Sequence, residues 1–478
     1  GFLGGTEMAR PVAAQWQAWI ERRVRDNIGW DAIASGIILA RSRRDGQTYG
    51  DFIAEQSGYT RRENPTDFAA AGNPMPHYWF RSNLAQPKEK ALAFGYTFLG
   101  LRLDCAECHK HPYDQWSKRD FELFTEFFSR IKAGVAPDAA LLFKHEQNRL
   151  GVPIKLDTAA LRRQSYLRVA TEGLRIPWKE IYVEAPGDTP QPARLLGGAH
   201  LDLSQYRDPR EPLMQWVLQE PNRYFAKAFV NRIWANYFNI GIIDPPDDLN
   251  QANPPSNKAL LDYLAQGFVD SGYDMKWLHR TIATSRTYQL DWRPNDTNRT
   301  DQRNFSHAVL RRLPAEVAVD ALKQATDNDT LLDQVASSVV KRTIGQHPLS
   351  SQTRSIDFAL LIFGKPLRIT NCDCERQSEP TLLQALYVRN DQELLEMLDR
   401  KDGWLMQLAG GKQSKVPVDE MPVDEFIRSA YLRTLSRHPT DVELADCRTH
   451  LSEQDDRSDG MRDLLWALLN TQEFITNH

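Results

Sequence analysis

Apolar residues recur at intervals of three and four along much of this chain, and that spacing restricts its fold more than any other feature. Between residues 12 and 42, Trp16, Trp19, Ile20, Val24 and Ile28 form such a stripe. Similar spacing, with capping residues, predicts helices over residues 88–103, 117–131, 212–218, 222–238, 258–269, 274–282, 314–325, 380–398, 423–435, 441–451 and 463–474. The sequence therefore predicts a mainly α, multi-helical protein.

One stretch breaks this pattern. Ile181–Val183 and Arg194–Leu196 are short β-like runs, separated by the turn-rich segment P-G-D-T-P-Q-P. They indicate a small β-hairpin or sheet in a central connector. We therefore divide the chain into a helical domain over residues 1–134, a connector over 135–205 and a mainly helical partner domain over 206–478.

Length and charge narrow the class of protein. At about 100–200 residues per domain, 478 residues allow two to four domains. The 59 basic and 63 acidic side chains leave a net charge of -4 without long blocks of either sign, which argues against a nucleic-acid binder held by a basic field. No run of 18 uncharged apolar residues predicts a membrane span. The opening residues GFLGGTEMAR lack the features of a signal peptide, so we expect a mature or truncated product.

Cysteine is scarce but clustered. The chain has five cysteines, too few for a disulfide scaffold, and four of them fall in two tight pairs. The first pair forms Cys105-Ala106-Glu107-Cys108-His109, the C-x-x-C-H pattern of c-type haem attachment. Two thiols at this spacing add to the two vinyl groups of one porphyrin, and the adjacent imidazole reaches the iron. Independent placement of the cysteines and the 11 histidines predicts roughly 0.001 such strings.

The position of this motif follows from the helices around it. The segment comes directly after the predicted helix over residues 88–103. It precedes a helix that begins with a capping box formed by Ser117 and Asp120. We therefore expect the Cys105–His109 segment in a turn between two helices.

Other readings of the same segment stay open. A zinc knuckle would need two further ligands, which His111, or Cys372 and Cys374, could supply if the fold brought them near. A plain thiol pair or disulfide is a third reading, although the βαβ context of a thioredoxin-like motif is missing.

The sixth iron ligand is less well defined by the sequence. His111 lies two residues from His109, too close to reach the opposite face of the same haem. We expect it to contribute to cofactor binding through a hydrogen bond, or to serve another centre. Met75 and His77 are candidates for the distal position. A filled sixth position favours electron transfer, whereas an open one favours catalysis.

The second cysteine pair lies in Cys372-Asp373-Cys374-Glu375-Arg376. Cysteines two apart seldom bridge each other, but two thiolates beside a carboxylate can hold a soft metal. The alternative is surface electrostatics, with Arg376 paired to Glu375. Both readings stay open.

Two other features favour a structural role rather than a functional one. His279 lies within a predicted helix, where a hydrogen-bonded structural histidine is the expected role. Asp244, Asp247 and Asp248 fall in a Pro- and Asn-rich segment that is typical of a turn-rich loop rather than a cation site. No phosphate-binding loop, dinucleotide fingerprint or nucleophile elbow appears in the sequence.

Several long segments resemble a known family. Residues 98–121 (F-L-G-L-R-L-D-C-A-E-C-H-K-H-P-Y-D-Q-W-S-K-R-D-F) look like the signature of the planctomycete-type cytochrome-C-like domain. Residues 222–234, 271–288, 372–386 and 466–478 are similar to its partner domain of unknown function, so the resemblance is of the PSCyt/PSD type. These matches run through nearly the whole chain.

The resemblance implies an extracytoplasmic, periplasmic location, in proteins often preceded by a separate cytochrome c domain and a secretion signal. It marks Cys105, Cys108 and His109 as haem-attachment candidates. It also marks positions of unassigned role, namely His111, Asp114, Cys372, Cys374, Glu375 and Arg376. His77 stands where a residue such as Asn is expected in the family.

Three functions follow as hypotheses. The first is an extracytoplasmic haem c protein that transfers electrons, with redox partner proteins or as a subunit of a larger assembly. The second is a haem- or metal-dependent enzyme acting on carbohydrate or another polymer. The third is a non-catalytic scaffold with a structural metal such as zinc.

Overall fold

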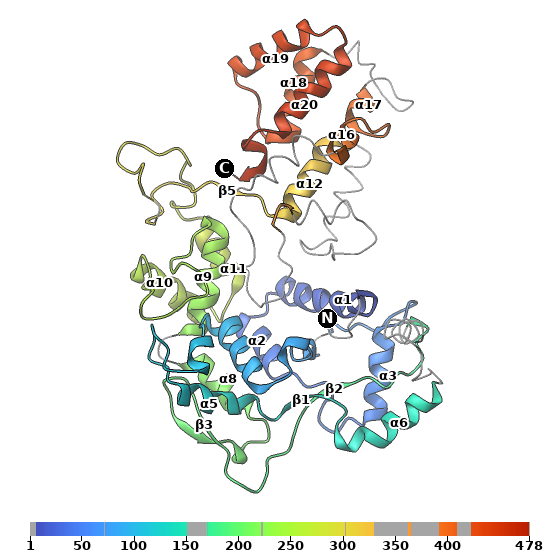
Figure 1. The fold of residues 1–478 in the computed structure, drawn as a ribbon, viewed down its shortest axis with the longest axis vertical. Helices are drawn as coiled ribbons and strands as arrows, with labels where there is room; N and C mark the ends of the chain where they lie inside the picture. Colours follow the sequence, from blue (N-terminus) through green and yellow to red (C-terminus); the bar gives the residue numbers. More distant parts are fainter. Residues whose placement is uncertain are drawn as a thin grey trace. The chain divides into compact units, whose positions relative to one another are not determined.

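The fold is described from a computed structural model, which divides the chain into two compact units, residues 1–308 and 309–478 (Figure 1). The structure describes residues 6–70, 72–150, 169, 171–220, 223–301, 303–328, 362–364, 392–408 and 422–477. The boundaries expected at residues 134 and 205 both fall within the first unit, and as sequence domains they stay a prediction.

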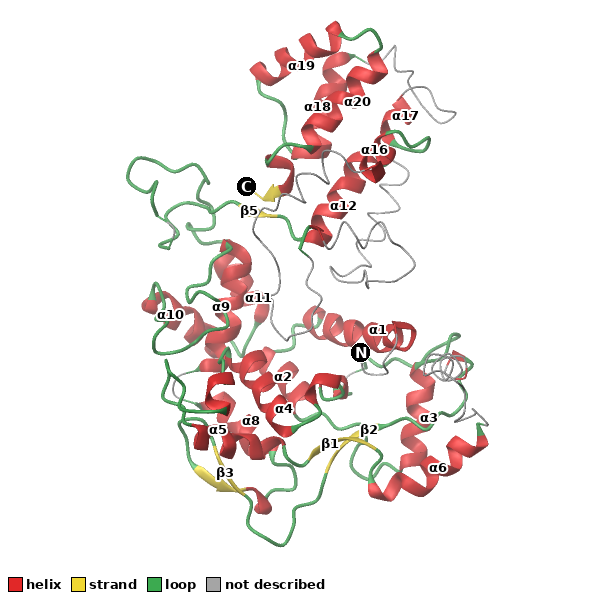
Figure 2. Cartoon of the chain, viewed as in Figure 1, coloured by secondary structure: helices red, strands yellow, loops and turns green. Residues whose placement is uncertain are grey.

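The first unit is built mainly of α-helices, as the apolar spacing predicts (Figure 2). Its helices are α1 (Thr6–Arg25), α2 (Trp30–Ile38), α3 (Tyr49–Tyr59), α4 (Pro87–Phe94), α5 (Lys118–Thr125), α6 (Ala140–Arg149), α8 (Arg210–Gln219), α9 (Tyr224–Phe238), α10 (Lys258–Asp270) and α11 (Met275–Ala283). Within the described ranges, no helix combines the length and apolar composition needed to cross a bilayer.

Small antiparallel sheets accompany these helices. In the first unit, β1 (Ile131–Gly134) pairs with β2 (Glu180–Val183), and β3 (Pro192–Arg194) pairs with β4 (His200–Asp202). The first β-like run of the connector, Ile181–Val183, lies in β2, whereas only Arg194 of the second run lies in a strand, and the two runs do not pair with each other. The second run forms a strand two residues earlier than its apolar residues indicated, because Leu195 and Leu196 instead join the hydrophobic core.

Several helix boundaries differ from the periodicity; the helix expected over residues 117–131, for example, ends at Thr125, and Ile131 begins β1. The stripe over residues 12–42 is divided between α1 and α2, because the chain turns at Asn27, whose φ is 55°. The helix expected over residues 88–103 stops at Phe94 and continues as a π-helical turn, η3 (Gly95–Leu99). That turn ends at Gly100, which has a φ of 63°. A left-handed residue at a helix end is a position that glycine suits best.

One extended hydrophobic core unites most of the first unit. It contains buried side chains from α2, α4, α5, α8, α9, α10 and α11. A smaller cluster joins Tyr49, Phe52 and Ile53 of α3 to Ala136 and Ala139 before α6, and Figure 1 shows α3 and α6 side by side. The large core thus combines helices from both ends of the unit's sequence.

The second unit has its own core. Its described helices are α12 (Ala315–Thr326), α16 (Gln392–Leu398), α17 (Trp404–Leu408), α18 (Val423–Leu435), α19 (Asp441–Glu453) and α20 (Arg457–Leu469). A two-residue pairing joins β5 (Arg311–Arg312) to β6 (Thr476–Asn477). The helix expected over residues 463–474 begins earlier, at Arg457, because the Asp456 side chain caps it by accepting from the Ser458 N–H. Of the helix expected over 380–398, residues 380–391 lie outside the described residues.

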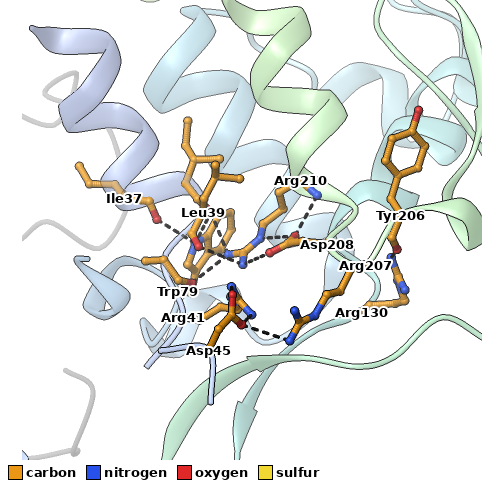
Figure 3. Close-up of polar contacts among 12 residues, drawn as sticks. Ile37, Leu39, Arg41, Asp45, Trp79, Arg130, Tyr206, Arg207, Asp208 and Arg210 are labelled. Carbon is orange, nitrogen blue, oxygen red and sulfur yellow. Dashed lines mark hydrogen bonds and ion pairs between the residues drawn. The ribbon is translucent and has the colours of Figure 1, made fainter. Parts of the chain in front are cut away.

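A buried arginine joins α8 to the end of α2 (Figure 3). Arg210 is fully buried and forms an ion pair with Asp208, at 2.9 Å from Nε and 2.6 Å from Nη2. It also donates to the carbonyl oxygens of Ile38 and Ala40 at 2.8 and 3.0 Å, and to that of Leu39 at 3.3 Å. The last carbonyls of a helix have no partner within the helix, and here Arg210 supplies one.

Candidate functional site

The Cys105–His109 segment lies in a surface turn between two helices, as the sequence predicts. A 3-10 turn, η4 (Asp104–Glu107), contains its first residues, and α5 follows with Ser117 and Asp120 forming the expected capping box. Ala106 is fully buried and anchors the turn, and the His109 N–H donates to the Cys105 carbonyl at 3.3 Å. Local helix signals thus place this segment at the surface.

Both thiols of the motif are accessible. Cys105 and Cys108 are free and exposed, on either side of the buried Ala106. The third described cysteine, Cys447 of α19, is buried with its Sγ 3.9 Å from the Tyr431 hydroxyl, and burial raises the pKa of its thiol. Cys447 is therefore an ordinary buried thiol, while Cys105 and Cys108 are open to chemical modification.

His109 is held with one ring nitrogen available. Its Nδ1 lies 2.6 Å from the carbonyl oxygen of Lys110. Because a carbonyl can only accept, Nδ1 carries the proton, and Nε2 of the neutral ring keeps a free lone pair. A backbone carbonyl fixing the tautomer in this way is the usual arrangement for a metal-ligating histidine.

His111 is arranged differently. Its side chain is buried. The backbone N–H of His111 donates to the Trp116 carbonyl at 2.8 Å, and the ring Nδ1 accepts from the backbone N–H of Tyr113 at 3.2 Å. In the neutral ring Nε2 therefore carries the proton, and neither nitrogen offers a free lone pair. Both of these hydrogen bonds hold the loop together, and a role of His111 in cofactor binding or at another centre stays a prediction.

A polar recess lies beside the motif. It has a volume of about 510 Å³ and is lined by residues 110–114 and by Gln251 and Ala252. Asp114 is buried in its wall, and burial raises the pKa of this carboxyl. Burial, together with the Asp114 carboxylate, raises the pKa of Tyr224 to about 12. The recess thus joins the loop after the motif to the loop that follows α9.

Arg232 of α9 supports the chain leading into the motif. It donates to the carbonyl oxygens of Tyr96 and Thr97 in η3, each at 2.5 Å, and forms an ion pair with Asp247 at 2.5 Å. Burial, with Asp247 nearby, raises the pKa of the Tyr96 hydroxyl. Sequence reasoning missed this role of Arg232, whose two carbonyl partners lie more than 130 residues earlier.

Gly100 brings the same two segments into close contact. The Leu249 N–H donates to the Gly100 carbonyl at 3.0 Å. A Cβ atom at position 100 would lie 3.0 Å from side-chain atoms of Ala228 and Leu249. A glycine in the sequence does not by itself indicate a positive φ or a close contact with another segment, so the role of Gly100 was not predicted.

The acidic residues after α9 have structural partners. Asp244 accepts from the Gly241 N–H at 3.3 Å, and Asp248 accepts from the Asn250 side chain at 2.9 Å. With Asp247 paired to Arg232, this segment is the turn-rich loop that the sequence favours. His279 is likewise a structural histidine, with its Nδ1 2.9 Å from the Tyr237 hydroxyl.

Neither distal candidate has a side chain directed to an open site. Met75 is fully buried in the core. The Nε2 of His77 lies 2.8 Å from the Gln15 Oε1, its ring stacks on Phe68, and burial lowers its pKa to about 4. A distal role for either residue stays a prediction.

The described cysteines and histidines do not build a metal cluster by themselves. Among the residues that the structure describes, no three His, Cys, Asp or Glu side chains are grouped so that they could hold a metal ion. Cys372, Cys374, Glu375 and Arg376 lie outside the described residues. The zinc reading, whose further ligands were expected from His111 or from Cys372 and Cys374, therefore stays a prediction.

Two protein-family models match this chain. The model described as PSD1, protein of unknown function (DUF1553), matches residues 209–451, and that described as PSCyt2, protein of unknown function (DUF1549), matches residues 4–133. Neither a curated protein nor a solved structure matches it. The resemblance noted in the sequence is thus confirmed at the level of these two planctomycete-type domains, and no cytochrome c domain is found.

Proposed function

The chain belongs to the PSD1 family of proteins of unknown function (DUF1553), and we propose that it is an extracytoplasmic c-type haem protein with a redox role. In this proposal Cys105 and Cys108 attach the haem covalently and Nε2 of His109 binds its iron. When bound, the haem supplies one-electron redox chemistry. Covalent attachment retains the cofactor outside the cytoplasm, where a free one would be lost.

The state of His109 is the observation that carries the proposal. An exposed imidazole, with Nδ1–H donated to the Lys110 carbonyl, has a free Nε2 in the same short segment as two free, exposed thiols. The three groups occupy one short turn that is anchored by the buried Ala106. These groups suit haem attachment, because the thiols are unpaired and the Nδ1 contact with the Lys110 carbonyl leaves Nε2 of the neutral ring with a free lone pair.

The chemistry of the donor set favours haem over zinc. Structural zinc needs four side-chain ligands grouped around one ion, and no such group is present among the described residues. Haem makes a smaller demand on the chain, because the porphyrin supplies four iron ligands and the thiols bond to carbon rather than to the metal. One free imidazole and two free thiols are sufficient.

The surroundings of the turn fit a site that exchanges electrons with another protein. Cys105, Cys108 and His109 are all exposed. Arg232 and Gly100 fix the start of the loop, so the turn is held on a rigid support although it lies at the surface. We therefore include a redox partner protein, or a larger assembly, in the proposed function.

The proposal is tested by asking what is attached to the two thiols. The chain would be exported with a secretion signal in cells that carry haem-maturation machinery, with a known cytochrome c matured alongside as a positive control. We expect the intact mass to rise by one haem, a haem stain that survives denaturation, and a reduced-minus-oxidised difference spectrum.

Variants assign the signal to residues. The double variant Cys105→Ser/Cys108→Ser should lose covalent haem entirely, whereas Cys447→Ser, at the buried thiol, should keep it. His109→Ala should keep the thioethers but change the spectrum of the iron. If the chain has an unmodified mass while the control cytochrome is matured, the proposal is wrong, and zinc found by metal analysis would support the scaffold hypothesis instead.

A further inference from the structure

A second cavity lies in the first unit, between α9, α10 and α11, and nothing in the proposed redox role uses it. Its volume is about 300 Å³, at the lower end of the range for small-molecule sites. Leu260, Leu264, Ile282 and Phe305 form an apolar wall, together with Trp234, which is almost fully buried. Such a wall excludes water from one face of a small ligand.

The rest of the lining carries unused hydrogen-bonding capacity. Asn257 caps α10 through its Oδ1, which accepts from the Leu260 N–H at 3.0 Å, and this leaves its amide N–H groups free to donate. Ser285 accepts from the Tyr288 N–H at 3.2 Å and keeps its own proton. The Thr281 hydroxyl donates to the Trp277 carbonyl and keeps its lone pairs. The lining residues therefore offer both donors and acceptors, as a polyhydroxylated molecule requires.

One charged side chain lines the cavity. Arg303 is exposed, and none of the hydrogen bonds or ion pairs in the described part of the chain engages its guanidinium. By contrast, the nearby Arg299 forms an ion pair with Asp296 at 2.9 Å. No Asp or Glu is among the described lining residues, so no lining carboxylate pairs with the Arg303 guanidinium. A guanidinium in this situation favours a carboxylate, which it can bind through two parallel hydrogen bonds.

The loop that carries Arg303 is held in place. The Asp301 carboxylate accepts from the backbone N–H groups of Arg303, Asn304 and Ser306, at 3.0, 2.8 and 3.1 Å. The hydrogen bond from the Ser306 hydroxyl contributes most to lowering the pKa of Asp301, and the backbone N–H groups add to it. The carboxylate is therefore charged at neutral pH. Tyr263, another lining residue, is 64% exposed, so its ring is accessible for stacking on a ligand.

We infer that this cavity binds a sugar acid of monosaccharide size. The carboxylate pairs with Arg303, the hydroxyl groups bond with Asn257, Thr281 and Ser285, and the C–H face of the ring packs on Tyr263. A neutral sugar would leave the arginine unpaired, and a simple short acid would leave the hydroxyl and amide groups unused.

The inference is tested by titrating the full chain with glucuronate, glucose and acetate, followed by protein NMR or calorimetry. Concentrations up to about 10 mM fill even weak small-molecule sites. We expect glucuronate to bind at least about tenfold more tightly than glucose or acetate, as one charge-assisted contact allows. The measurement is independent of haem, so its failure leaves the proposed redox role untouched.

Matched variants locate the site. Arg303→Gln should reduce glucuronate affinity to that of glucose, and Arg299→Gln, a few residues away, should leave it unchanged. Ser285→Phe, which fills the cavity, should abolish binding of both sugars, with the thermal melt of each variant checking its fold. Equal binding of glucuronate and glucose, no effect of Arg303→Gln, or no binding of any probe would each overturn the inference.

Discussion

Replacing Arg210 by Met tests how strongly the end of α2 depends on α8. The substitution keeps much of the apolar stem but removes the guanidinium that pairs with Asp208. Removing one partner of a buried ion pair costs about 3–5 kcal/mol. The Leu39 and Ala40 carbonyls also lose a donor, at about 1 kcal/mol each, whereas Ile38 keeps the Trp79 indole N–H at 3.1 Å.

We therefore expect Arg210→Met to lower the free energy of unfolding of the first unit by about 5–7 kcal/mol, a large part of the roughly 5–15 kcal/mol typical of a domain. Urea unfolding followed by tryptophan fluorescence measures this loss. The signal comes mainly from the first unit, since 10 of the 12 tryptophans lie within residues 1–308.

Two further variants make the reasoning refutable. Arg207→Met removes an exposed arginine that is 3.1 Å from Asp45, and this change should cost no more than about 1 kcal/mol (Figure 3). The double variant Arg210→Met/Asp208→Asn removes the stranded charge and should recover roughly half of the loss. If Arg210→Met costs no more than Arg207→Met, the buried network does not stabilise the fold as argued.

Other predictions concern pH and backbone geometry. Burial lowers the pKa of His77 to about 4. Between about pH 6.5 and pH 4 the unfolded chain therefore binds a proton at His77 that the folded chain does not bind. The free energy of unfolding should fall by up to about 3 kcal/mol as the pH is lowered through this range. His77→Gln should flatten this dependence in urea titrations from pH 7 to pH 4, while the same change at the exposed His200 should not; equal slopes for His77→Gln and wild type would contradict the assignment. Gly100→Ala should destabilise the fold by about 1 kcal/mol more than Gly46→Ala. Both positions have a positive φ, but of the two only Gly100 has neighbours within 4 Å of the added Cβ. Equal melting temperatures of the two variants would show that the contact with Ala228 relaxes without cost.

Short-range features of the fold could be predicted from the sequence. The capping box of Ser117 and Asp120 begins α5, Asp274 caps α11, and the surface turn of Cys105–His109 follows from the helices on either side. Each of these depends on residues within a few positions of one another. Local chemistry decides such features, and the sequence displays it directly.

Features that depend on distant partners could not be predicted. The strand over Glu180–Val183 pairs with residues 131–134, about 50 positions earlier, and no local pattern names that partner. Arg210 and Arg232 look like ordinary helical arginines in the sequence, but their guanidinium groups bind carbonyl oxygens more than 130 residues away. In the candidate site, the motif residues were predictable, whereas the tautomers of His109 and His111 and the support from α9 were not.

The contacts across Gly100 and Arg232 have a consequence for how such a chain can be inherited. The PSCyt2 match ends at residue 133 and the PSD1 match begins at residue 209, as if two separable modules had been joined. In the structure, however, Arg232 of the PSD1 region donates to the carbonyl oxygens of Tyr96 and Thr97 in the PSCyt2 region. Gly100 of the PSCyt2 region packs against Ala228 of the PSD1 region. Recombination between residues 133 and 209 would expose apolar surface on both fragments, so selection should keep the two modules in one gene and let them change together.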